Sequence, residues 1–179
     1  MLRDDARVVV VSQGTVDNTD PGKLIVPTLE ALADGPHVVL ATTGGVQTSE
    51  LRARFGGSPG VVVEDYVDYD ALFPHTDVFV SSGGFGSLLA ALRHGVPVIG
   101  AGQQEGKNDV NARVDHNGLG VDLRNERPKA AAIRRAVDTV LGDPSYAARV
   151  AQVRAELEAY TPYARIEEVL EEEGRPAHA

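Results

Sequence analysis

Cysteine is absent from the 179-residue sequence, which excludes disulfide bonds and thiolate metal sites and fits a cytoplasmic protein. Positive charge is scarce: 17 Lys and Arg face 26 Asp and Glu, and the net charge of −9 disfavours binding to nucleic acid or to an anionic membrane. No apolar run approaches the ~20 residues that a membrane span needs. The five histidines show no metal-ligand spacing, so no metal site is predicted.

Short β-branched runs alternate with longer amphipathic stretches, a pattern typical of a parallel sheet covered on both faces by helices. We predict an α/β fold, a Rossmann-like three-layer α/β/α domain with a six-stranded parallel sheet. The predicted strands are residues 8–12, 37–42, 61–64, 78–81, 98–101 and 120–123. The predicted helices are residues 21–33, 48–55, 84–94, 107–117, 128–141, a segment that ends at 159, and 163–173.

The length suits one domain with a sizeable core. Near the C-terminus, Pro162 lacks a backbone donor and disfavours helix at the residue before it, so the last helix is predicted to be separate. We therefore expect the domain to span residues 1–161, followed over residues 162–179 by a C-terminal helix and a frayed tail.

Residues 78–87 are the most informative stretch, because a buried strand runs there into a glycine-rich turn and then a helix. Glycines let a ligand approach the backbone, and amides at a helix start attract an anion, so the stretch is predicted to bind phosphate. Leu89 stands where a dinucleotide fingerprint needs glycine or alanine, no Walker A lysine follows, and Val80 replaces the glycine of a nucleophile elbow. A tight strand-to-helix turn without a ligand is the alternative.

A second glycine turn, Ser12-Gln13-Gly14-Thr15, follows the first predicted strand. The carboxyl ends of parallel strands meet at one edge of a sheet, where open α/β folds bind ligands. These residues could therefore reach the same anion, and a plain turn is the alternative.

Two runs, FVSSGGFGS at residues 79–87 and ALRHGVP at residues 91–97, resemble the signature of the UDP-glycosyltransferase superfamily, whose bacterial members decorate antibiotics and other natural products. The resemblance extends over essentially the whole chain, and the run NARV at residues 111–114 follows near the expected spacing. It implies the C-terminal half of a GT-B fold, with residues 1–161 binding a nucleotide sugar. The helix after residue 161 would cross to an N-terminal acceptor domain expected to be missing here, or be an ordinary terminal helix.

The resemblance implies a donor site with three parts. The diphosphate is expected at Gly14, Thr15, Ser82, Gly83, Gly84, Gly86 and Ser87, the base on the Tyr66 ring and the Val67 backbone, and the sugar at Gln104, Glu105, Lys107 and Asn108. Glu105 and the pair Lys107-Asn108 remain alternatives for the main sugar contact. Without a ligand, Tyr66 would be a half-buried core aromatic and residues 104–108 a solvated charged loop.

Two positions depart from the family pattern. Ser82 stands where the family often has a histidine against the phosphate. A serine carries no positive charge, so the turn amides and the helix dipole must contribute more of the phosphate binding. Ala90 stands where the family has a glutamate that grips the ribose, and alanine accepts no hydrogen bond. We therefore expect a nucleoside without a 2′-hydroxyl, as in a dTDP-sugar.

The function implied is inverting transfer of a sugar from dTDP or UDP to a hydroxyl of a small natural-product acceptor, with no metal or other cofactor. No catalytic residue is predicted, because the base would come from the acceptor domain and His94 suits a helix C-cap. This chain alone is expected to bind the donor without turnover. The alternatives are a donor subunit of a two-protein transferase, such as the split N-acetylglucosamine transferase of lipid-linked oligosaccharide synthesis, an epimerase-like nucleotide-sugar enzyme, and a non-catalytic nucleotide-binding module.

Overall fold

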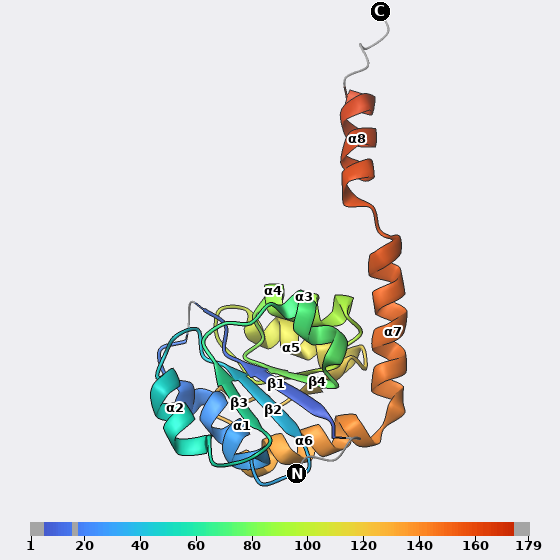
Figure 1. Ribbon diagram of the computed structural model, residues 1–179. Helices are drawn as coiled ribbons and strands as arrows, with labels where there is room; N and C mark the ends of the chain where they lie inside the picture. Colours follow the sequence, from blue (N-terminus) through green and yellow to red (C-terminus); the bar gives the residue numbers. More distant parts are fainter. Residues whose placement is uncertain (1–5, 16–17, 174–179) are drawn as a thin grey trace, which may run out of the picture.

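The centre of the protein is a six-stranded parallel sheet, and the predicted α/β class is confirmed (Figure 1). The computed structural model describes residues 6–15 and 18–173. The strands are β1 (Val8–Ser12), β2 (Val38–Thr42), β3 (Val61–Glu64), β4 (Val78–Ser81), β5 (Val98–Gly100) and β6 (Gly120–Asp122). Their order across the sheet is β3-β2-β1-β4-β5-β6, the order of the Rossmann fold.

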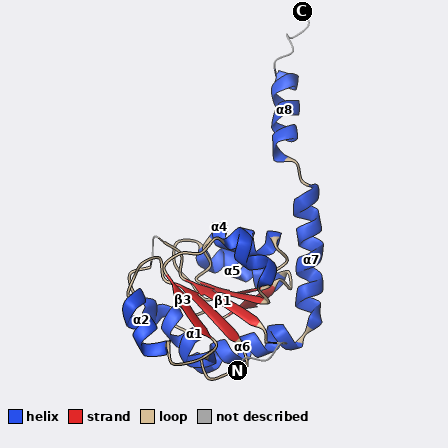
Figure 2. Ribbon diagram, viewed as in Figure 1, coloured by secondary structure: helices blue, strands red, loops and turns tan. Residues whose placement is uncertain are grey.

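Helices form a layer on each side of the sheet (Figure 2). One layer consists of α1 (Ile25–Leu32), α2 (Thr48–Phe55) and α6 (Ala130–Gly142). The other consists of α3 (Tyr69–Leu72), α4 (Phe85–Arg93), α5 (Lys107–His116) and α7 (Pro144–Ala159). Two 3-10 turns, η1 (Pro21–Lys23) and η2 (Phe73–His75), complete the body of the domain.

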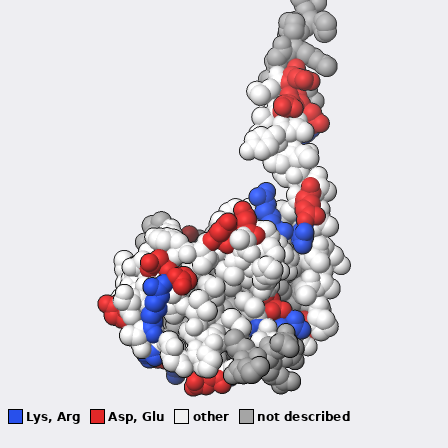
Figure 3. All heavy atoms as spheres, viewed as in Figure 1, with Lys and Arg blue, Asp and Glu red and all other residues white. Residues whose placement is uncertain are grey.

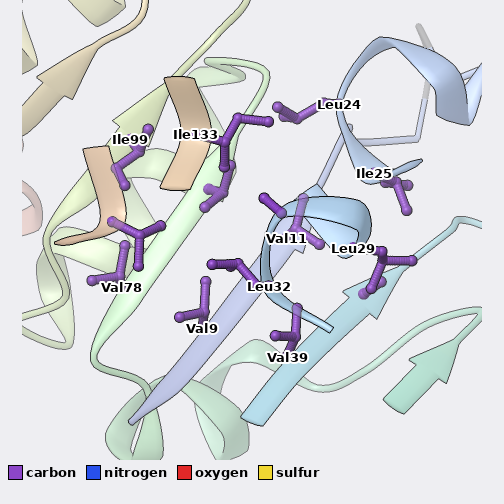
Figure 4. Close-up of a cluster of buried hydrophobic side chains, with 14 of the residues drawn as sticks. Val9, Val11, Leu24, Ile25, Leu29, Leu32, Val39, Val78, Ile99 and Ile133 are labelled. Carbon is purple, nitrogen blue, oxygen red and sulfur yellow. The ribbon is translucent and has the colours of Figure 1, made fainter. Parts of the chain in front are cut away.

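Strand β1 shows why the sheet needs both layers. Successive side chains of a strand point to opposite faces, and Val9, Val10 and Val11 are all fully buried. Val9 and Val11 pack in the cluster with α1 and α6 shown in Figure 4, whereas Val10 packs in the cluster with α4. A strand that is apolar on both faces therefore lies at the centre of the sheet, as the unbroken valine run predicts.

The predicted helix over residues 21–33 is wrong as one element. Asp20 caps η1, but Leu24, with a φ of −141°, breaks the helix before α1 begins. The cause is a buried side chain from the turn after β1: the Gln13 Oε1 atom accepts the amides of Leu24 and Ile25, both at 3.0 Å. Gln13 therefore supplies the cap that the start of α1 lacks locally.

The short helices α3 and η2 were not predicted. They span only seven residues together, too few for a helical period to show in the sequence. Their side chains pack as an aromatic group, with the rings of Tyr69 and Phe73 stacked at 4.7 Å and Phe73 edge-on to Phe79 at 5.1 Å. This group positions the loop after β3 against the sheet.

The C-terminal part leaves the body of the domain (Figure 1). Helix α7 packs along α4, and α8 (Pro162–Glu173) then projects outward as a separate helix, starting at the predicted proline. The side chains described on α8 are exposed, and acidic ones gather there (Figure 3). A domain boundary at residue 161 stays a prediction, and the predicted frayed tail at residues 174–179 lies outside the described residues. Within the described part of the chain, no helix is long and apolar enough to cross a membrane.

Leu29→Ala is expected to lower the free energy of unfolding by about 2–5 kcal/mol, because Leu29 is fully buried between α1 and the sheet and its truncation leaves a cavity. The matched control is Leu170→Ala on the exposed α8, which should change stability by less than about 0.5 kcal/mol. Urea unfolding followed by circular dichroism measures both. Equal losses would contradict the assignment of the core.

Candidate functional site

A cavity of about 480 Å³ opens at the carboxyl ends of β1 and β4. These strands are neighbours, and their last residues, Ser12 and Ser81, are paired in register. The chain continues from β1 to β2 and β3 on one side and from β4 to β5 and β6 on the other, so the cavity lies at the point where the strand order reverses. Open α/β sheets bind their ligands at this point.

Most of the residues predicted to bind the donor line this one cavity. They are Gly14, Thr15, Tyr66, Val67, Ser82, Gly83, Gly84, Gly86, Ser87, Glu105 and Lys107. Gln104 and Asn108 do not line it and are exposed. Asn108 follows Lys107 on α5, and a helix turns neighbouring side chains about 100° apart, so both cannot face the cavity.

The sequence-based prediction missed further residues of the cavity wall. They include Thr42, Gly44, Asp65, Tyr69, Phe85, Gly106 and Val110, whereas Ser12 and Gln13 belong to the second glycine turn that the sequence already indicated. Thr42 is the last residue of a predicted strand, so its position at the sheet edge was the available signal. Tyr69 belongs to α3, which was not predicted, so no sequence signal indicated its place in the cavity wall.

The turn between β4 and α4 offers some backbone amides and not others. The amide of Ser82 donates to the Ser12 carbonyl at 3.3 Å, and that of Gly83 donates to Ser81 Oγ at 3.1 Å. Among the described residues, none accepts a hydrogen bond from the amides of residues 84–87. The amides that can meet an anion are therefore those of the first turn of α4, and Ser82 and Gly83 contribute none.

The two serine hydroxyls expected at the phosphate already donate hydrogen bonds to backbone carbonyls of the protein. Ser82 Oγ donates to the Gln13 carbonyl at 3.0 Å, and Ser87 Oγ donates to the Gly84 carbonyl at 3.1 Å. A hydroxyl has one proton to donate, so neither serine donates to a phosphate in this arrangement. The Ser82 bond instead ties the β4 turn to the β1 turn.

Asn111 of α5 explains several of the glycines. It is fully buried, and its Nδ2 atom donates to the Gly102 carbonyl at 2.9 Å. A Cβ atom on Gly83 would lie 2.6 Å from the Asn111 side chain, and one on Gly100 would overlap it outright. These glycines make room for Asn111, so part of the glycine-rich turn has a packing role that was not predicted from the sequence.

The wall near β3 presents a tyrosine. Tyr66 is 68% exposed, and its hydroxyl donates to the Gly44 carbonyl at 2.9 Å. Next to it, Asp65 accepts a hydrogen bond from Thr48. Tyr66 is therefore not a core aromatic: its ring is held in place at one end and leaves a face open for stacking.

The opposite wall carries the charged pair of the loop before α5. The Lys107 Nζ atom lies 3.1 Å from Glu105 Oε2, and the Lys107 side chain is 10% exposed, against 64% for Glu105. The loop at 104–108 is therefore solvated only in part. His94 ends α4 as its C-cap, as predicted, and its ring pairs with Asp70 at 3.0 Å.

The family of the chain follows from comparison with known proteins. Residues 28–172 match the model of the erythromycin biosynthesis protein CIII-like C-terminal domain. The chain belongs to this family. The resemblance to natural-product glycosyltransferases is thereby confirmed for the CIII-like domain.

Curated relatives and solved structures agree with the match. The CIII-like domain is 41% identical to 4'-demethylrebeccamycin synthase of Lentzea aerocolonigenes over 155 residues, 86% of the chain and 35% of that protein. It is 38% identical to UDP-glycosyltransferase 2 of Phaeomoniella chlamydospora over 162 residues, 89% of the chain and again 35% of the relative. The crystal structure of CalG4, the calicheamicin glycosyltransferase, superposes with a TM-score of 0.83 at 26% identity, covering 97% of the chain and 46% of CalG4.

The chain thus spans about a third of the length of the curated relatives it matches. Its fold is that of the C-terminal domain of GT-B glycosyltransferases, and the expected GT-B half is confirmed.

Two glycines of the β4 turn should respond oppositely to alanine. Gly83→Ala is expected to destabilise the CIII-like domain by roughly 2–4 kcal/mol, because its φ is +92° and a Cβ would meet Asn111. Gly86→Ala should stabilise it by about 0.4–1 kcal/mol, because position 86 is helical and open. Urea unfolding of both variants measures the contrast, and a neutral Gly83→Ala would refute the packing role.

Proposed function

We propose that the CIII-like domain binds the nucleoside-diphosphate sugar of a glycosyltransferase. The observation that carries the proposal is the set of open amides at residues 84–87, at the N-terminus of α4 and in the wall of the cavity. A helix N-terminus favours an anion through its dipole and its free N–H groups. The cavity volume lies within the range of about 300–1,000 Å³ that small-molecule sites occupy.

The three parts of the donor would be distributed along the cavity. The diphosphate would bind the amides of residues 84–87, with Gly14 and Thr15 facing it from the β1 turn. The base would stack on the open face of Tyr66 and bond to the Val67 backbone, and the sugar would extend toward Glu105. Glycine at positions 84 and 86 leaves the backbone accessible on this side.

The reaction proposed for the whole enzyme is an inverting transfer, in which an acceptor hydroxyl attacks the anomeric carbon and the nucleoside diphosphate leaves. Negative charge develops on the leaving diphosphate, and preorganised amides stabilise such charge without a metal ion. The base that activates the hydroxyl and the acceptor pocket would belong to an N-terminal domain, matching the share of its relatives that this chain does not cover. The names of relatives, such as 4'-demethylrebeccamycin synthase, support a small natural-product acceptor.

Helix α8 would complete the contact with that N-terminal domain. Its apolar residues Ile166, Val169 and Leu170 are exposed, although an amphipathic helix normally buries such a stripe. They share one face because their spacing of three and four residues follows the helical period. The body of the CIII-like domain does not cover this face, which supports a partner elsewhere in the enzyme.

Tyr66→Ala is expected to weaken binding of the nucleoside diphosphate about 5- to 150-fold, because base stacking on an aromatic side chain contributes about 1–3 kcal/mol. Isothermal titration of the 179-residue chain with dTDP and UDP measures the loss. Tyr160→Ala is the matched control, since Tyr160 is similarly exposed and lies outside the cavity. Unchanged affinity in Tyr66→Ala would contradict the proposal that the base stacks on Tyr66.

The nucleobase and ribose can be tested separately. Ala90 lies one helical turn after Gly86 on α4, and its methyl side chain offers no acceptor for a 2′-hydroxyl. We expect dTDP to bind at least as tightly as UDP, and the variant Ala90→Glu to shift the preference toward UDP. Competition titrations with dTDP, UDP and dUDP separate the effect of the 2′-hydroxyl on affinity from the effect of the 5-methyl group. Clearly tighter binding of UDP to the unmodified chain would contradict the dTDP-sugar assignment.

A further inference from the structure

Lys107 is the buried cation of the cavity. The whole residue is 8% exposed, it is the first residue of α5, and it lines the cavity together with Gly83 and Gly84. Lysine is rarely buried unless it is paired, since desolvating an ammonium costs free energy. The ion pair with Glu105 meets this need and keeps the ammonium in the cavity wall.

The path of the Lys107 side chain leads to the phosphate turn. A Cβ atom on Gly102 would overlap the Ser82 carbonyl oxygen and lie 2.7 Å from the Lys107 Cδ atom. The lysine stem and the Ser82 carbonyl thus both lie against the same side of Gly102. The ammonium, two bonds beyond Cδ, is within reach of a group bound at the first turn of α4.

The charge balance of the cavity gives Lys107 a specific use. The charged side chains among the described lining residues are Asp65, Glu105 and Lys107. Asp65 already accepts a hydrogen bond from Thr48, and the α4 dipole supplies the equivalent of only about half a positive charge. A diphosphate brings at least two negative charges, so it needs the ammonium to offset the carboxylates around it.

The ion pair between Glu105 and Lys107 can separate at little cost. The side chain of Glu105 is 64% exposed, so water solvates the carboxylate once it leaves the ion pair and the separation costs little free energy. Its backbone has a φ of +57°, beside Gly106 at +77°, so the loop turns sharply just before α5 and directs both side chains toward the same space. An exposed carboxylate is a weaker partner for the ammonium than a phosphate held by several amides.

We propose that Lys107 binds the terminal phosphate of the nucleoside diphosphate, and that this phosphate replaces Glu105 as its partner. The inference rests on the proposed function, and it moves Lys107 from the sugar hydroxyls, where the family resemblance put it, to the leaving group. The released Glu105 carboxylate then accepts a hydrogen bond from a sugar hydroxyl. Lys107 would also stabilise the charge that grows on the terminal phosphate as the glycosidic bond breaks.

The decisive experiment compares ligands that differ only in their phosphates. Thymidine, dTMP and dTDP, and the matching uridine series, are titrated into the unmodified chain, Lys107→Met and Lys129→Met. Lys129 is an exposed lysine before α6, so its variant removes the same charge away from the cavity. Lys107→Met should weaken binding of the diphosphates about 10- to 100-fold and that of nucleoside and monophosphate less than about threefold, while Lys129→Met should change neither.

A second variant tests the exchange of partners without removing the lysine. Glu105→Gln should tighten diphosphate binding about three- to tenfold, because the competing carboxylate is gone. This arm also stands if Lys107→Met fails to fold. Diphosphate affinity that is unchanged in Lys107→Met, or lost equally for thymidine, would overturn the phosphate contact, and weaker diphosphate binding in Glu105→Gln would overturn the exchange. Failure of the unmodified chain to bind any of the diphosphates would instead overturn the proposed function itself.

Discussion

The site depends on one contact between two strands, the parallel pairing of β1 with β4. Because Ser12 and Ser81 are in register, the turns that follow them leave the sheet side by side. Two hydrogen bonds then join these turns, from the Ser82 amide to the Ser12 carbonyl and from Ser82 Oγ to the Gln13 carbonyl. Gln13 in turn caps α1 with its side chain. One serine thus links the start of α4 to the start of α1, and the cavity forms between them.

The glycines around this contact fall into two groups with different physical roles. Gly83 and Gly100 lie against the buried Asn111, where any side chain would collide with it. Gly84 and Gly86 face the cavity, and a Cβ on Gly86 would meet nothing within 4 Å. Close packing of α5 therefore requires the first group, and only the second keeps the backbone open for a ligand. The position of the open amides follows from this division, since packing and hydrogen bonding already use the residues before Gly84.

Much of the architecture could be predicted from the sequence because its signals are local. Valine runs such as residues 8–11 mark strands that are buried on both faces, and glycine or proline marks most helix ends. The cavity residues Gly14 and Gly83 could be found because both follow predicted strands. Interactions between distant residues left no such signal. The cap that Gln13 provides for α1, the burial of Asn111 beneath Gly83 and the internal bonds of the Ser82 hydroxyl and amide depend on how the chain folds back on itself.

The overall charge of the protein constrains how its cavity can hold an anion. With a net charge of −9, the domain as a whole does not attract a diphosphate, and salt screens its charges beyond a Debye length of about 10 Å, so long-range attraction contributes little to binding. Affinity must come from donors in direct contact, and these are fixed in place: the amides belong to a helix, and the Lys107 stem is confined beside Gly102. Donors held in this way need little reorganisation when charge develops on a leaving group, which is the electrostatic requirement of glycosyl transfer. The acidic composition therefore does not conflict with the proposed anionic substrate, because the proposed contacts lie within a few ångströms of the first turn of α4.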